Sequence, residues 1–208
     1  MDGRAGQVLR GKRLEYFTIA WNTLEGIVAI LAGAVAGSIS LMGFGIDSFI
    51  EVLSGSALLW RMSVDADVEQ RRRNEKRALR IVGLCFLALA VYLAYESGAA
   101  LLRRRAPEHS IAGIVLACAS LVVMPLLSRA KRRLAAELGS GAMHADAQQT
   151  EFCAYLSAIL LGGLTMHSVF GLWWTDSAAA LLMVPLIGKE GIEAVRGEGC
   201  GGCWEKCT

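Results

Sequence analysis

The sequence predicts an all-α membrane protein, a polytopic bundle of six transmembrane helices with the N- and C-termini in the cytoplasm. Hydrophobic residues make up 54% of the 208 residues and charged residues 19%, whereas soluble domains have about 45–50% apolar and about 25% charged residues. Apolar stretches near the ~20 residues that cross ~30 Å of hydrocarbon recur along the chain. Basic residues gather on one side of these stretches. The summed apolar length argues against a soluble helical bundle.

Six membrane spans are expected, at residues 14–37, 40–60, 78–102, 111–128, 142–166 and 177–195. The first is too long to be the core of a cleavable signal peptide. The segment 64–80 mixes charges at helical spacing and is expected to extend the third helix into the cytosol. Small residues let membrane helices approach closely. The first two helices are expected to pack in this way through Gly33, Gly37, Gly43, Gly45 and Gly55.

The basic residues set the orientation. Of the 21 Lys and Arg residues, all but Arg103, Arg104 and Arg105 fall on one side of the six spans. The positive-inside rule makes that side cytoplasmic. This explanation accounts for the basic clusters without a nucleic-acid partner, so none is expected.

The second span carries two acidic residues in apolar surroundings. Asp47 and Glu51 are four residues apart, which stacks their carboxyl groups on one helical face. They lie about 10 and 16 Å into the span, where an ionised side chain costs about 2.5–3.5 kcal/mol. No Lys or Arg is expected at that depth. The pair is therefore either protonated and hydrogen-bonded between helices, or the binding site of a cation in a narrow wet cavity.

The fifth span adds a second polar face. Asp146, Gln149, Thr150 and Cys153 follow helical spacing, whereas Glu151 is about 140° round the helix from Asp146 and should point elsewhere. For Gln149 and Thr150, ordinary hydrogen bonding between helices is an equal alternative. Asp146 adds a third deep carboxylate.

Three carboxylates from two helices suit a divalent cation. Zn²⁺ takes four ligands in a tetrahedron and accepts carboxylate oxygen. A site of oxygens alone would also accept Mn²⁺ or Fe²⁺, and a thiolate from Cys153 would favour Zn²⁺. The expected metal site is Asp47, Glu51, Asp146 and Thr150, with Gln149, Cys153 and Glu25 as possible additional ligands.

Two segments resemble a known family. GSISLMGFGIDSFIEVLSG, at 37–55, is similar to the second helix of the cation diffusion facilitators, in which a glycine–serine turn precedes paired acids. WTDSAAALLMVPLIGKEGIEA, at 174–194, resembles the sixth helix of that family, with Asp176 at its outer mouth. With Asp146-x-x-x-Thr150 in the fifth span, the chain is identified as a short, divergent member. The resemblance covers the transmembrane portion only.

The resemblance implies a function and its partners. Members export Zn²⁺ or a related divalent ion (Mn²⁺, Fe²⁺, Co²⁺ or Cd²⁺) from the cytosol in exchange for protons, and work as homodimers in the lipid bilayer. The ion is a transported ligand, and no prosthetic group is implied. Asp47 and Glu51 match the helix-two ligands, and Asp146 matches the first helix-five ligand. The short loops favour a bacterial inner membrane.

The chain departs from the family pattern at two places. Thr150 stands where the family has Asp, so the fourth ligand is expected from Gln149, Cys153, Glu151 after a helix irregularity, Glu25 or water. The family's C-terminal cytosolic domain is not recognised after the last span. The expected organisation is a transmembrane cation-efflux domain at 1–195 and a Cys-rich tail at 196–208. The tail contains Cys200-x-x-Cys203, a common half of a zinc site, and Cys207. The tail is expected either to bind no metal or to load metal into the transporter.

Two other functions compete with transport. A membrane metal-binding or adaptor protein that does not transport is suggested by Thr150. An intramembrane enzyme with a catalytic metal would need an open coordination position and a substrate cleft. His144 and Asp146 are two residues apart, a poor spacing for two ligands on one helix. The chain is therefore not expected to be an enzyme.

Overall fold

The structure is a bundle of long α-helices. The computed structural model describes residues 2–63, 68–104 and 107–196. The described residues form six helices, in the expected order, and contain no strand. The helices are α1 (Asp2–Ala36), α2 (Ile39–Ser63), α3 (Val68–Arg103), α4 (Ile111–Leu138), α5 (Gly141–Phe170) and α6 (Thr175–Arg196). The all-α expectation is confirmed, and the largest differences in boundary are that α1 and α3 begin earlier and α4 ends later than the apolar stretches suggested.

Five described helices, α1 to α5, are long and apolar enough to cross a membrane. α6 differs because charged residues occupy both of its ends: Asp176, Lys189, Glu190, Glu193 and Arg196. α6 nevertheless packs along α3 as part of the same bundle. The chain is therefore a multi-pass membrane protein built as a six-helix bundle.

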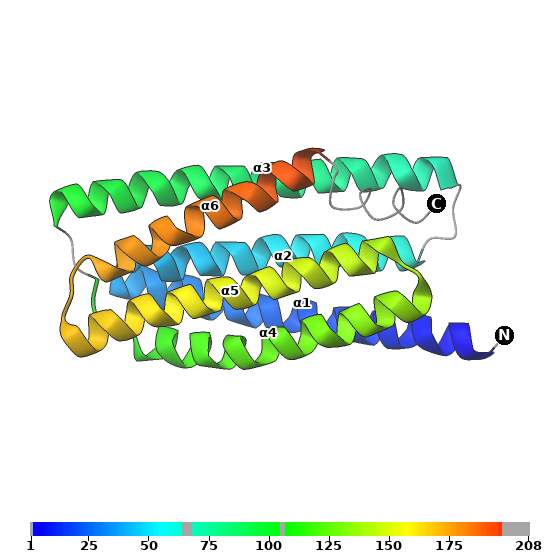
Figure 1. The fold of residues 1–208 in the computed structure, drawn as a ribbon, viewed down its shortest axis with the longest axis horizontal. Helices are drawn as coiled ribbons and strands as arrows, with labels where there is room; N and C mark the ends of the chain where they lie inside the picture. The colour runs from blue at the N-terminus through cyan, green and yellow to red at the C-terminus, as the bar shows by residue number, and fades with distance from the viewer. Residues whose placement is uncertain (1, 64–67, 105–106, 197–208) are drawn as a thin grey trace.

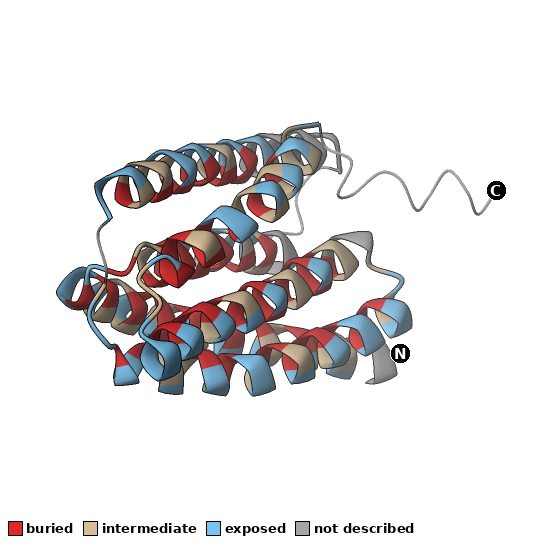
Figure 2. Ribbon diagram, turned by 60° about the vertical axis from the view of Figure 1, so that its left-hand side comes forward, coloured by how far each residue is buried: buried red, intermediate tan, exposed pale blue. Residues whose placement is uncertain are grey.

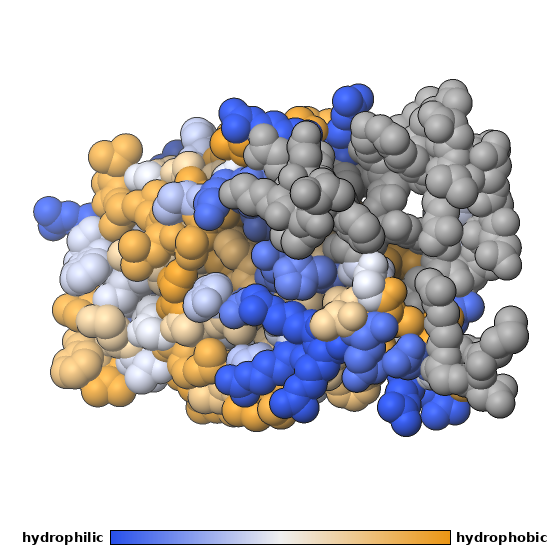
Figure 3. Space-filling view, turned by 45° about the vertical axis from the view of Figure 1, so that its right-hand side comes forward, coloured by the Kyte–Doolittle hydropathy of each residue, from blue (hydrophilic) through white to orange (hydrophobic). Residues whose placement is uncertain are grey.

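The surface fits an apolar environment. Large hydrophobic side chains are exposed along the helices, with Val35 81%, Leu102 88% and Ile111 77% exposed. Exposed apolar area on this scale is typical of membrane contact. Figure 2 shows the buried faces of the helices turned toward one another, and Figure 3 shows hydrophilic residues gathered around the end where α1 begins.

α2 lies at the centre of the bundle. The closest helix pairs are α1 with α2, α3 with α6, and α4 with α5, and α2 also contacts α3, α5 and α6 (Figure 1). α1 begins and α6 ends toward the same end of the bundle, which we call the terminal end; the opposite end is the far end. Polar residues on α2 can thus meet side chains from α1 and α5.

Glycines set the closest helix contacts. A Cβ on Gly45 would lie 2.8 Å from Ile30 of α1, which confirms the close approach expected of the first two helices. Gly43 instead faces Leu93 of α3. α3 also approaches α6 closely, since a Cβ on Gly83 would lie 2.8 Å from the carbonyl oxygen of Gly191.

Asp176 fixes the start of α6 to the start of α2 at the far end. Its carboxylate accepts hydrogen bonds from the hydroxyl of Ser38 at 2.6 Å, from the backbone N–H of Ile39 at 2.8 Å and from the hydroxyl of Ser40. Backbone N–H groups at a helix start have no partner within the helix, and a carboxylate is a favourable acceptor for them. Asp176 therefore has a structural contact that holds two helices in register.

Candidate metal site

The centre of the bundle contains a cluster of charged side chains from four helices. Glu15 of α1, Glu51 of α2, Lys131 of α4, and Asp146 and Thr150 of α5 are each at most 5% exposed. We call these five residues the lysine cluster. Three of them, Glu51, Asp146 and Thr150, belong to the metal site expected from the sequence.

The lysine ammonium joins the cluster together. Nζ of Lys131 donates to Oδ2 of Asp146, to Oε2 of Glu15 at 3.2 Å and to Oγ1 of Thr150 at 3.2 Å. The hydroxyl of Thr150 in turn donates to Oε1 of Glu51 at 2.8 Å. An ammonium has three donors, and these contacts use all three.

This arrangement corrects one expectation. We expected no Lys or Arg at the depth of the buried acids, because Lys131 follows the apolar part of the fourth span. α4 instead continues as a regular helix to Leu138, and Lys131 is fully buried against Asp146. The interior therefore has a positive charge of its own.

Asp47 lies on the face of α2 that carries Glu51, one turn nearer the far end. It is 2% exposed. Beside it, the hydroxyls of Ser48 and Ser120 both donate to Glu25, from Ser48 at 3.0 Å. Glu25 is therefore held by α2 and α4, about three turns of α1 away from Glu15 of the lysine cluster.

Two of the possible additional ligands also lie on the inner face of α5. Gln149 is 9% exposed, and its Oε1 accepts a hydrogen bond from Ser54 at 2.8 Å. This contact is the interhelical bond that was the alternative to metal binding for this residue. Cys153 is 1% exposed, one turn beyond Gln149, and it forms no disulfide.

Glu151 faces outward, as the helical spacing predicted. It is paired with Arg132 of α4, and both side chains are more than a third exposed. α5 is a continuous helix through this region, so no irregularity turns Glu151 inward.

Within the described residues, no three His, Cys, Asp or Glu side chains stand close enough together to hold a metal ion. In the lysine cluster, the ammonium of Lys131 contacts both Asp146 and Thr150. The tail cysteines Cys200, Cys203 and Cys207 lie outside the described residues.

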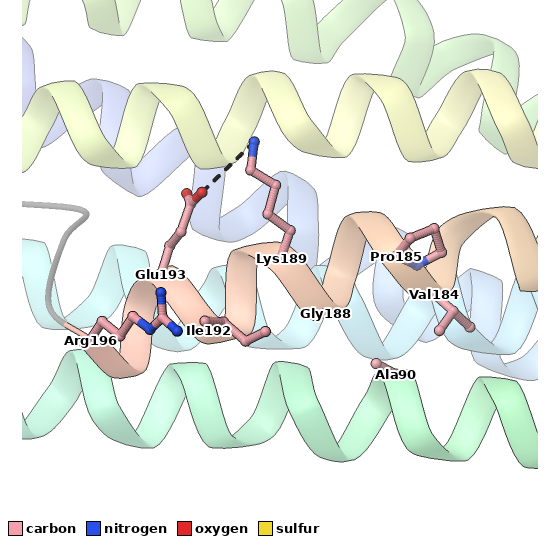
Figure 4. Close-up of a pocket in the computed structure, with 8 residues that line it drawn as sticks. All are labelled: Ala90, Val184, Pro185, Gly188, Lys189, Ile192, Glu193 and Arg196. Atoms are coloured by element: carbon pink, nitrogen blue, oxygen red, sulfur yellow. Dashed lines mark ion pairs between the residues drawn. The ribbon is translucent and has the colours of Figure 1, made fainter.

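A shallow pocket lies elsewhere, between α3 and α6 (Figure 4). It contains no residue of the lysine cluster. Lys189 and Glu193 form an exposed ion pair at 3.7 Å along its edge. Its other lining residues are Ala90, Val184, Pro185, Gly188, Ile192 and Arg196.

Glu15 and Lys131 were missed by the sequence analysis, although a signal for them exists. Glu15, Thr18, Asn22 and Glu25 recur at the spacing of one buried helical stripe, and all four are buried. The buried stripe of α4 likewise runs through Ser120, Met124, Leu127, Ser128 and Lys131. A stripe of this period indicates an inward face, so it marks these charged residues as interior.

Comparison with known proteins agrees with the fold. The profile of the cation efflux transmembrane domain matches residues 78–197, more than half of the chain. The chain is 24% identical to the cation-efflux pump FieF of Shewanella oneidensis over 172 residues, which are 80% of this chain and 58% of the pump.

Two further relatives match over a similar span. An uncharacterized transporter of Methanocaldococcus jannaschii is 27% identical over 83% of this chain and 62% of its own length. Transmembrane protein 163 of Xenopus laevis is 26% identical over 86% of this chain and 64% of its own length. The chain thus spans about three fifths of the length of the curated relatives that it matches.

Proposed function

Because this chain belongs to the cation efflux family, we propose that it exports a divalent transition-metal cation, Zn²⁺ or a related ion, from the cytosol in exchange for protons. The family match supports cation transport rather than catalysis. The terminal end is the cytosolic end, because the basic clusters of the sequence lie there. We also propose that the chain resides in a bacterial inner membrane and forms a homodimer.

The observation that carries the proposal is the cluster of buried acids shared by α2 and α5. Buried charged residues inside a membrane bundle mark ion pathways. Glu51 and Asp146 are linked through Thr150, and Asp47 lies one turn further along α2. These residues, which the sequence analysis assigned to the metal site, are the proposed ligands, with Cys153 or Gln149 as possible additional ligands.

Protons and the metal ion would compete for the same carboxylate oxygens. In the state open to the cytosol, the ionised carboxylates hold the cation. In the outward-open state, protonation weakens their affinity and releases it. The coupling therefore requires no covalent step, and a rearrangement of the helices around α2 alternates the access.

The test uses the purified chain in sealed vesicles with an imposed proton gradient. Uptake of Zn²⁺ and of Mn²⁺ is measured for the wild type and for Asp47→Ala, with Glu193→Gln as a control at an exposed carboxylate of α6. We expect gradient-driven flux that is lost in Asp47→Ala and kept in the control. Flux that Asp47→Ala leaves unchanged would contradict the proposed site.

A second candidate function is a membrane metal-binding protein that does not transport. The position of Lys131 favours it, since the ammonium already neutralises Asp146. In the same vesicles, stoichiometric Zn²⁺ binding without flux of either ion would support this candidate over the antiporter.

A further inference from the structure

The ammonium of Lys131 is bound in the manner of a ligand-coordinated ion. The Lys131 side chain is 0% exposed, and Nζ contacts a carboxylate oxygen of Asp146, a carboxylate oxygen of Glu15 and the hydroxyl oxygen of Thr150. Asp146 and Thr150 are two of the four proposed metal ligands. The lysine therefore occupies the position on α5 that a transported cation requires.

The cluster still has unused binding capacity for positive charge. Oε1 of Glu15, Oε2 of Glu51 and Oδ1 of Asp146 are buried and have no hydrogen-bond donor among the described residues. A buried polar atom without a partner is unfavourable by about 1–3 kcal/mol. Glu15 and Asp146 contact the ammonium directly, and Glu51 is linked to it through Thr150. These three free carboxyl oxygens indicate a site that can accept more positive charge than the single one of Lys131.

We propose that Lys131 is a tethered competitor of the transported cation, which leaves Asp146 and Thr150 when a divalent ion binds and is then held by Glu15. This inference rests on the proposed function. It makes Lys131 and Glu15 specificity-determining residues that lie beside the ion site.

Glu15 is the natural acceptor of the displaced ammonium. It already lies 3.2 Å from Nζ and belongs to α1, whereas Asp146 and Thr150 belong to α5. A buried ammonium that lost every anionic partner would be strongly destabilising. Retaining the contact with Glu15 lets the lysine move without leaving an unpaired charge.

The exchange also favours divalent over monovalent ions. A monovalent ion offers the carboxylates no more charge than the tethered ammonium does, and it must bind from solution. A divalent ion doubles the attraction at the same distance. The lysine thus lowers the affinity for every cation by the same cost of displacement, and the stronger attraction of a divalent ion offsets that cost more readily.

The test measures binding of Zn²⁺ and of Mn²⁺ to the purified full chain in detergent by titration calorimetry. The variants are Lys131→Met, Glu15→Gln and the double variant Glu15→Gln/Lys131→Met. We expect Lys131→Met to bind about tenfold more tightly and Glu15→Gln about tenfold more weakly than the wild type. In the Lys131→Met background, Glu15→Gln should change the affinity by less than about twofold.

Lys189→Met is the matched control, because it removes a lysine from an exposed ion pair. It should bind as the wild type does. Thermal melting of each variant checks that it is folded. The double variant guards against misfolding of Lys131→Met, since it leaves fewer buried carboxylates unpaired, and it too should bind more tightly than the wild type.

Two outcomes distinguish failure of this inference from failure of the proposed function. Wild-type binding with no gain in Lys131→Met and the double variant, or an equal effect of Glu15→Gln in both backgrounds, would overturn the role of Lys131 and leave transport standing. No binding of either ion by any variant, with no flux in vesicles, would overturn the proposed function and this inference together.

Discussion

The hydroxyl of Thr150 lies 2.8 Å from Oε1 of Glu51 and joins α5 to α2 at the centre of the bundle. The resemblance to the cation diffusion facilitators implies an aspartate at this position, which would place another carboxylate beside Glu51. Here the same neighbourhood holds the ammonium of Lys131, 3.2 Å from the threonine oxygen. A neutral hydroxyl can bridge a carboxylate and an ammonium by donating to one and accepting from the other.

Thr150→Asp should strengthen binding of the transported ion. The new carboxylate offsets the charge of Lys131 and supplies a better metal ligand than a hydroxyl, so we expect Zn²⁺ to bind about tenfold more tightly. Titration calorimetry on the purified protein measures the change. Thr150→Val, which has nearly the same shape without the hydroxyl, serves as the control and should not gain affinity. Equal affinities of Thr150→Asp and Thr150→Val would show that position 150 does not contact the ion.

Glu151→Gln should leave transport unchanged within about twofold, because an exposed ion pair contributes little. Its carboxylate is paired with Arg132 at the surface and faces away from Asp146. The comparison variant is Asp146→Asn, which should abolish gradient-driven Zn²⁺ uptake in vesicles. A large loss of uptake in Glu151→Gln would mean that α5 rotates during transport.

Asp176→Ala should destabilise the far end of the bundle. The change removes the acceptor of three hydrogen bonds from the start of α2, with an expected loss of about 3 kcal/mol of unfolding free energy. Thermal denaturation in detergent measures it, and Asp176→Asn should fall between the wild type and the alanine variant. If Asp176→Ala had the same melting temperature as the wild type, these hydrogen bonds would contribute nothing to the stability of the bundle.

Gly191→Ala and Gly188→Ala form a matched pair on one helix. A Cβ on Gly191 would lie 3.0 Å from the carbonyl oxygen of Gly83 in α3, whereas a Cβ on Gly188 meets nothing within 4 Å. We expect Gly191→Ala to lose about 1–3 kcal/mol through overpacking and Gly188→Ala to gain up to about 1 kcal/mol through helix propensity. The melting temperatures of the two variants in detergent test this expectation. Equal melting temperatures would mean that α3 and α6 separate readily.

The sequence by itself determined the class of the fold and supplied every residue that is proposed as a ligand. Apolar stretches of membrane length are readable one segment at a time, because the bilayer thickness sets their length. Helical spacing likewise placed Asp47 with Glu51, and Asp146 with Thr150, on inward faces, since side chains four residues apart share a face. Helical spacing also predicted that Glu151 faces away from the site, and the structure confirms this.

Only the tertiary structure decided what those carboxylates contact. Lys131 and Glu15 are 116 residues apart in the chain and 3.2 Å apart in space, and the distance between them depends on how α1 and α4 pack. Lys131 is buried because α4 continues beyond its apolar part. The composition of that segment alone would predict exposure to solvent. Charge pairing across helices is a property of the assembled bundle, because each partner offsets the burial of the other.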